Sequence, residues 1–89
     1  MHIVLTVVGK DRVGIIAKVS ALMASSGVNI LNINQNILDG FFNMFLVGDM
    51  ENATIPLKEL QAKAVALGEE IGVEIRLQSE EIFAAMHKI

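Results

Sequence analysis

The residues whose types and spacing could do chemistry are concentrated in one short segment, residues 9–15, with the sequence GKDRVGI. Gly9 and Gly14 do not form a phosphate-binding loop, because Gly14 is followed by two isoleucines and not by Lys and Ser or Thr. Free amides at a helix N-terminus favour a carboxylate, and glycines leave little bulk between the backbone and a ligand. The segment therefore indicates a small-ligand site. The alternative is a tight turn in which Asp11 caps a helix and Arg12 is solvated.

Asn29 is a second candidate for ligand binding. Its carboxamide offers both a donor and an acceptor, as recognition of an amino acid's amino and carboxylate groups requires. We expect Asn29 to lie at the start of a strand and close to residues 9–14. The alternative is a turn residue that bonds its own backbone.

No catalytic or metal-binding constellation is evident. The chain has no cysteine and two histidines, His2 and His87, far apart in the sequence. Disulfides, thiolate catalysis and cysteine-based zinc or iron–sulfur sites are therefore excluded. No serine has an evident base, and a lone histidine needs a supporting cluster to act. We expect no enzyme activity, no metal site and no cofactor.

The charge balance argues against nucleic acid as a partner. Seven basic residues face ten acidic ones, for a net charge of −3, whereas nucleic-acid-binding domains carry clustered basic residues. Residues 41–45 resemble the aromatic strand of RNA-recognition motifs, but Asp39 replaces the basic residue of that motif and Thr6 stands where a stacking aromatic is needed. No run of about 18 apolar residues and no basic leader is present. We expect a cytoplasmic protein with no membrane contact.

Hydrophobic periodicity predicts four strands and three helices. Alternating apolar residues indicate strands, and stripes at steps of three and four indicate helices. The expected strands are residues 2–8, 28–38, 41–50 and 73–78, and the expected helices are residues 13–25, 56–71 and 80–88. In the second strand, Leu31, Ile33 and Ile37 alternate with asparagines, so we expect one face of this strand to be buried.

Turn and cap residues set the predicted boundaries. Asp11 is the expected N-cap of the first helix and Ser79 that of the last. Gly27 suits the left-handed position after the first helix. Asp39 and Gly40 predict a tight hairpin, because both tolerate positive φ.

These elements predict one α+β domain, a ferredoxin-like βαββαβ sandwich. Two right-handed crossovers joined by a hairpin give a four-stranded antiparallel sheet of order 4-1-3-2, with two helices on one face. The strand at residues 28–38 is then an edge. We expect the domain to span residues 1–79. The short C-terminal helical tail, residues 80–89, is too short to be stable alone, so it must dock on the domain or on its dimer partner.

The composition predicts burial against a second chain. Apolar residues make up 53% of the sequence before its seven glycines are counted, against about 45–50% with glycine in typical domains. The apolar residues left over by the sandwich are Phe41, Phe45 and Val47 on the outer sheet face and Ile82, Phe83 and Met86 on the tail. We expect a homodimer through the edge strand, the outer sheet face or both.

With this element order, residues 9–15 resemble the first turn of ACT domains. The Asp-Arg-x-Gly signature lies between the first strand and the first helix, as in that family. Many such domains have proline where this chain has Val13, which here leaves one more amide free. The resemblance covers nearly the whole chain, including residues 28–30, 39–42 and 83–89. The chain is similar to small stand-alone ACT-domain proteins of bacteria and archaea.

The resemblance implies a non-catalytic regulatory module that binds a small metabolite, often an amino acid, at an interface between ACT units. It implies pairing through the second strand and regulation of a separate, unidentified protein. Amides near Gly14 would hold the carboxylate, and Asp11 or Asn29 the amino group. The ligand-binding residues implied are Gly9, Asp11, Arg12, Val13, Gly14 and Asn29. The alternative is a pure protein-interaction module with a vestigial ligand site.

Overall fold

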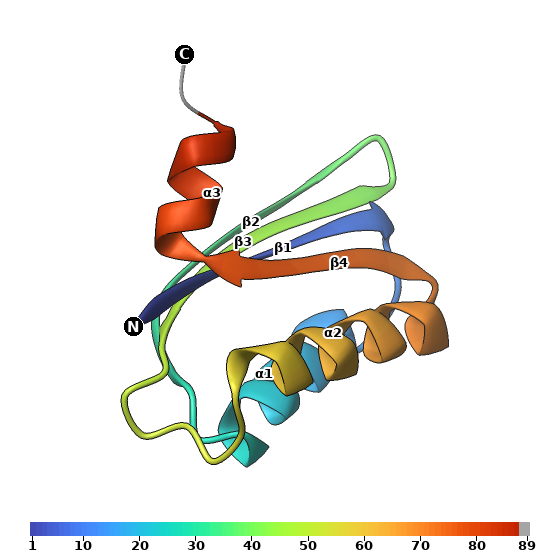
Figure 1. Cartoon of the computed structure of the whole chain (residues 1–89). Helices are drawn as coiled ribbons and strands as arrows, with labels where there is room; N and C mark the ends of the chain where they lie inside the picture. Colours follow the sequence, from blue (N-terminus) through green and yellow to red (C-terminus); the bar gives the residue numbers. More distant parts are fainter. Residues whose placement is uncertain (88–89) are drawn as a thin grey trace.

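The computed structural model describes residues 1–87, and its architecture confirms the predicted sandwich. The elements are β1 (His2–Lys10), α1 (Ile15–Ser25), β2 (Asn29–Leu38), β3 (Phe41–Asp49), α2 (Leu57–Ile71), β4 (Val73–Ser79) and α3 (Glu80–Met86). The antiparallel sheet has the order β2-β3-β1-β4, which is the predicted order read from the other edge. Both α1 and α2 lie on one face of the sheet, and α3 rises from the opposite face (Figure 1). We call this opposite face the open face.

The turns between elements follow the predicted local chemistry. Asp39 and Gly40 connect β2 to β3 with φ angles of 51° and 80°, as the hairpin prediction requires. Gly27 follows α1 with a φ of 74°. The Ser79 hydroxyl accepts a hydrogen bond from the amide of Ile82 at 3.2 Å, so the predicted cap of α3 is confirmed. These features depend on neighbouring residues only, which is why the sequence predicts them correctly.

The core lies between the sheet and the two helices. The expected helix at residues 56–71 is confirmed as α2, and its apolar residues recur at steps of three and four. Leu60 and Ala64 are buried, and Leu57, Leu67 and Ile71 pack against the core. Leu5 of β1 and Leu46 of β3 are cross-strand neighbours and are both inaccessible to solvent. Within residues 1–87, no helix is long and apolar enough to cross a membrane.

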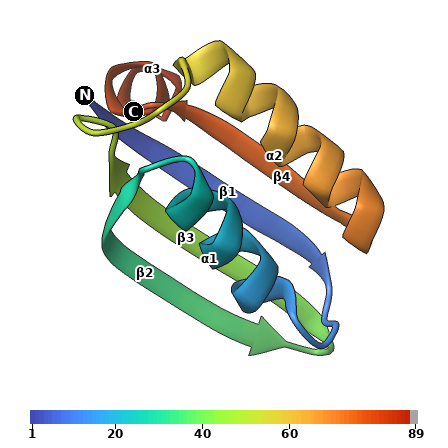
Figure 2. The same ribbon diagram turned by 90° about the horizontal axis from the view of Figure 1, so that it is seen from below.

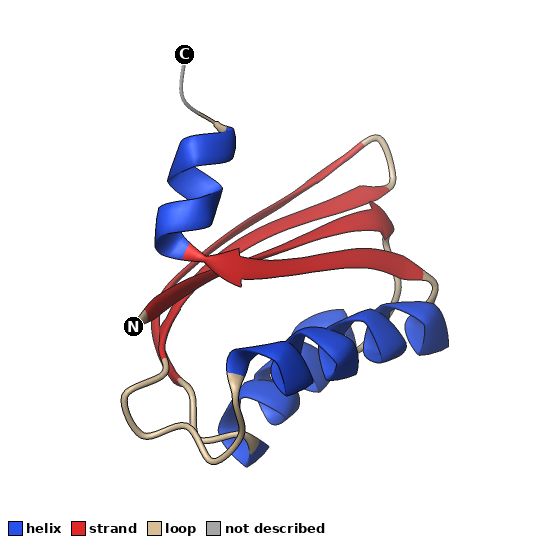
Figure 3. Ribbon diagram, in the orientation of Figure 1, coloured by secondary structure: helices blue, strands red, loops and turns tan. Residues whose placement is uncertain are grey.

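The face of β2 that we expected to be buried is exposed. Leu31, Ile33 and Ile37 are 48%, 38% and 58% exposed, so this prediction was wrong. The reason is the position of the helices, which leave the edge strand β2 largely uncovered (Figure 2). Figure 3 shows the long helices together below the sheet, in the view of Figure 1. A β-bulge between Ile30 and Asn32 further offsets the register of this strand. The edge strand therefore carries an exposed apolar row as well as its asparagines.

Helix α1 begins later than predicted and is not capped by Asp11. Its N-cap is Gly14, whose φ is 90°, and no side chain accepts a hydrogen bond from its first turn. Asp11 lies too far before Ile15 to reach those amides. Its own backbone amide donates instead to the carbonyl of Gly40 at 2.8 Å. The β1–α1 loop is thus tied to the β2–β3 hairpin.

The tail helix α3 touches the open face through an aromatic contact and a hydrogen bond that Gln78 Nε2 donates to Met86 Sδ at 3.0 Å. Phe83 packs edge-to-face on Phe45, with ring centroids 5.5 Å apart. No residue of α3 is buried, and Ile82 and Met86 are 55% and 56% exposed. Met86 is the last helical residue, and the predicted extension to Lys88 lies outside the described residues. The tail therefore leaves most of the outer apolar residues in contact with solvent.

Candidate functional site

A cavity of about 450 Å³ lies between the first turn of α1 and the last residues of β2. Figure 2 shows the start of α1 beside the end of β2. We call this cavity the α1 pocket. Its polar rim includes Asp11 and Gly14, and its wall includes Ile15, Ile37 and Phe42. The volume is in the range of about 300–1,000 Å³ that is typical of small-ligand sites.

Gly14 has a left-handed backbone conformation at the rim of the α1 pocket. Its φ of 90° is rarely adopted by other residues, whereas a Cβ added there would meet no heavy atom within 4 Å. Lys18 donates the first amide bond of the helix, to Gly14, at 3.0 Å. The preceding amides of the first turn therefore lack intrahelical partners. These uncapped amide donors suit the site to an anionic group. The open space beside Gly14 does not by itself indicate a ligand.

Arg12 and Val13 point away from the centre of the pocket. The Arg12 guanidinium lies along Gly72, where an added Cβ would be 3.4 Å from Nη2. Gly72 follows the last residue of α2, so this cation is well placed at the negative end of the helix dipole. Val13 is fully exposed. Arg12 contributes to the pocket lining, and Val13 does not.

Gly9 does not line the α1 pocket. It pairs with Val73 of β4, and a Cβ added at Gly9 would lie 2.7 Å from Val73 Cγ1. The space that we expected to serve a ligand is therefore filled by a neighbouring strand. The glycine is needed for close packing of β1 on β4.

We predict that Gly9→Ala destabilises the fold without touching the α1 pocket. Forcing a methyl group against Val73 is overpacking, which costs about 1–3 kcal/mol. Urea unfolding measures the change. A loss below about 0.5 kcal/mol would show that β4 yields easily, and this outcome would contradict the tight packing.

Asn29 lies at the opposite end of the sheet from residues 9–14, so the expected proximity was wrong within one chain. Asn29 pairs with Asp49, which pairs with His2 at the start of β1. Gly9, in contrast, pairs with Phe42 near the end of β2. At about 3.3 Å per residue, the two sites are about 25 Å apart. Asn29 can approach the α1 pocket only from a second chain.

The pocket wall was missed by sequence reasoning. Ile37 and Phe42 are cross-strand neighbours that close the pocket on the sheet side. The available signal was the hairpin, which places these two positions opposite each other. The sequence alone did not indicate that the β1–α1 loop folds toward this hairpin.

The His2 imidazole lies close to two carboxylates at the start of β1. Its Nδ1 is 3.7 Å from Glu80 Oε2, and its Nε2 is 3.9 Å from Asp49 Oδ2. These exposed contacts link the start of β1 to β3 and α3. Across residues 1–87, no group of three or more metal-binding side chains converges.

Comparison with known proteins identifies the family. The family model described as ACT domain matches residues 3–64. This chain belongs to the ACT domain family. It is 45% identical to a UPF0237 protein of Listeria monocytogenes over 89 residues, covering 100% of both chains. An ACT domain protein from Streptococcus pneumoniae has a TM-score of 0.82 at 38% identity and covers 93% of each chain.

The ACT fold also occurs in a larger regulatory protein. The regulatory subunit of aspartate kinase from Thermus thermophilus superimposes with a TM-score of 0.68, covering 89% of this chain and 51% of that one. Its 24% identity shows a shared fold and nothing more. ACT domains are typically regulatory modules that bind small ligands.

Proposed function

We propose that this ACT domain is a homodimeric sensor that binds an amino acid in the α1 pocket. The observation that carries the proposal is the meeting of uncapped helix amides with an apolar wall in one cavity of about 450 Å³. Such a cavity offers separate places for a carboxylate and for a side chain. The family's regulatory character supports this interpretation.

Each part of an amino acid has a chemical counterpart in the pocket. The amides that follow Gly14 would hold the carboxylate, because the helix N-terminus carries partial positive charge. The carboxylate of Asp11 would attract the ammonium group. Ile37 and Phe42 would contact the side chain, which favours an apolar amino acid.

The edge strand β2 supports dimerisation. Edge strands of natural proteins usually carry charged residues or proline that block pairing, but Asn29–Leu38 contains neither. A two-fold axis that pairs two copies of β2 antiparallel places the first residues of one strand beside the last residues of the other. Asn29 of the partner subunit would then approach the α1 pocket, and the predicted site would be shared by both chains.

Calorimetric titration with the standard amino acids tests the proposal. We expect at least one apolar amino acid to bind saturably and to raise the free energy of unfolding by about 2.7 kcal/mol at a hundredfold excess over Kd. Asp11→Asn and Asn29→Ala should each weaken binding about tenfold, because each removes a hydrogen bond or charge contact to the ligand.

Asp39→Asn is the matched control, because Asp39 is also an exposed acidic loop residue but does not line the pocket. It should leave the affinity unchanged. Equal weakening by both aspartate variants would indicate a general charge effect and contradict the site. If no amino acid gives heat on titration, the alternative of a protein-interaction module would be favoured. Affinity capture would then reveal the partner of that module.

A further inference from the structure

Asparagine side chains gather on the open face, where sheet propensity does not explain them. Asn36 of β2 is directly opposite Asn43 of β3, and Asn34 is on the same face of β2. Asparagine is depleted in strands, and exposed sheet faces usually carry charged or β-branched residues. None of these three carboxamides has a hydrogen-bond partner among the described residues. Their polar groups are therefore free to bind another molecule.

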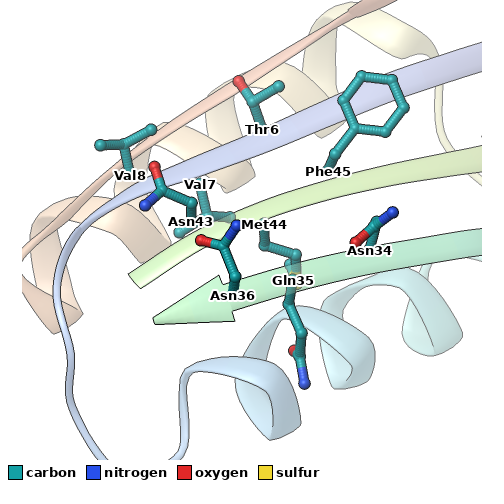
Figure 4. A pocket seen from close by; sticks show the side chains of 9 residues that line it. All are labelled: Thr6, Val7, Val8, Asn34, Gln35, Asn36, Asn43, Met44 and Phe45. Atoms are coloured by element: carbon teal, nitrogen blue, oxygen red, sulfur yellow. The ribbon is translucent and has the colours of Figure 1, made fainter. Parts of the chain in front are cut away.

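These carboxamides border a hollow of about 390 Å³ whose lining shares Gln35 and Asn36 with that of the α1 pocket. Figure 4 shows Thr6, Phe45, Asn36 and Asn43 on one side of the sheet, with Gln35 pointing to the other side. The register explains the arrangement, because Thr6 pairs with Phe45 and Val8 pairs with Asn43. Each of these two cross-strand pairs therefore brings one polar and one apolar side chain to the hollow.

The chemistry of this open-face hollow is neutral. The nine residues that line it are all uncharged. Arg76 lies in an adjoining hollow and pairs with Glu74 at 2.9 Å. The lining of the hollow therefore offers no charged partner to a phosphate or carboxylate group. It offers hydrogen-bond donors and acceptors that suit the edge of a neutral molecule.

Phe45 adds an aromatic surface to the amides. Its ring is 38% exposed and is held in place by the edge-to-face contact with Phe83. Aromatic side chains on a sheet stack bases in many proteins, and asparagine recognises the donor–acceptor edge of adenine. One aromatic residue can stack one base, and the net negative charge of the chain disfavours a polynucleotide. The surface is therefore suited to a single base.

We propose that the open-face hollow binds a neutral nucleobase or nucleoside, with the base against Phe45 and its polar edge on Asn36 and Asn43. The adjoining hollow of about 370 Å³ shares Thr6 and Val8 and provides room for a sugar. This site takes a ligand of a different class from that of the α1 pocket, and Asn36 borders both cavities. It makes the protein a candidate for responding to two different metabolites.

Titration of ¹⁵N-labelled full-length protein with adenosine, using NMR, tests the proposal. We expect saturable shifts of the backbone amides of Thr6 and Val8 and of the side-chain amides of Asn34, Asn36 and Asn43. Asn43→Ala should weaken adenosine binding about tenfold.

Asn32→Ala is the matched control. Asn32 is on the same face of β2 as Asn34 but does not line the hollow. Removal of its carboxamide should therefore leave the affinity for adenosine unchanged. Asn43 is in β3 and away from the β2 edge, so its variant tests the hollow without disturbing dimerisation. No saturable shift with millimolar adenosine, or equal weakening by both variants, would overturn the proposal. Shifts confined to residues around the α1 pocket would also overturn it.

Discussion

Ile33→Lys is expected to convert the proposed dimer into a monomer. Ile33 lies in the middle of β2 and is 38% exposed in the single chain. In a two-fold pairing of β2 with its copy, the two new ammonium groups would lie close together, and like charges across a strand pair are destabilising. Lysine is also a common means of blocking edge pairing in natural sheets. Light scattering should show the mass falling from twice 9.7 kDa to 9.7 kDa.

The control for this experiment is Val65→Lys, which adds the same charge at an exposed apolar residue of α2, 52% exposed and far from β2. It should leave the mass of the dimer unchanged. A wild-type protein that runs as a monomer at micromolar concentration would contradict pairing through β2. Dissociation by both variants would show that charge in general, rather than the edge strand, governs association.

Leu46→Ala is expected to reduce the free energy of unfolding by about 3–5 kcal/mol. Leu46 is inaccessible to solvent and lies in β3 between Leu5 of β1 and Ile33 of β2. The truncation removes buried methyl groups and leaves a cavity that a small core cannot easily close. Because domains are stable by only about 5–15 kcal/mol, a large part of the stability should be lost, as urea unfolding would measure.

Leu38→Ala provides a matched truncation in the same hairpin. Leu38 is 68% exposed, so its loss should change the free energy of unfolding by no more than about 0.5 kcal/mol. Similar losses for both leucines would mean that burial in the single chain does not determine stability. That result would instead point to burial of Leu38 against a partner.

Local patterns predicted most of the fold. The apolar stripe at Leu60 and Ala64, the Asp39–Gly40 hairpin and the Ser79 cap each depend on residues close in sequence. Hydrophobic periodicity also predicted the order of strands and helices along the chain. Because crossover connections are right-handed, that order favours one sheet topology. Membership of the ACT family confirms this interpretation of the chain.

The candidate site was only partly predictable. Asp11, Arg12 and Gly14 do line one pocket, but Gly9 packs on Val73. Sequence spacing cannot distinguish a glycine that leaves room for a ligand from one that leaves room for a strand. The difference depends on which element lies next to it in space.

The sequence by itself determined which side chains share a face, where turns fall and which family the chain resembles. The tertiary structure decided which of those faces are covered. Ile33 and Ile37 are exposed because the helices do not extend over the edge strand, and Asn29 is far from Gly14 because β1 and β2 place them at opposite ends of the sheet. The physical reason is that periodicity reports the direction of a side chain relative to its own backbone, whereas burial and proximity depend on how separate elements pack.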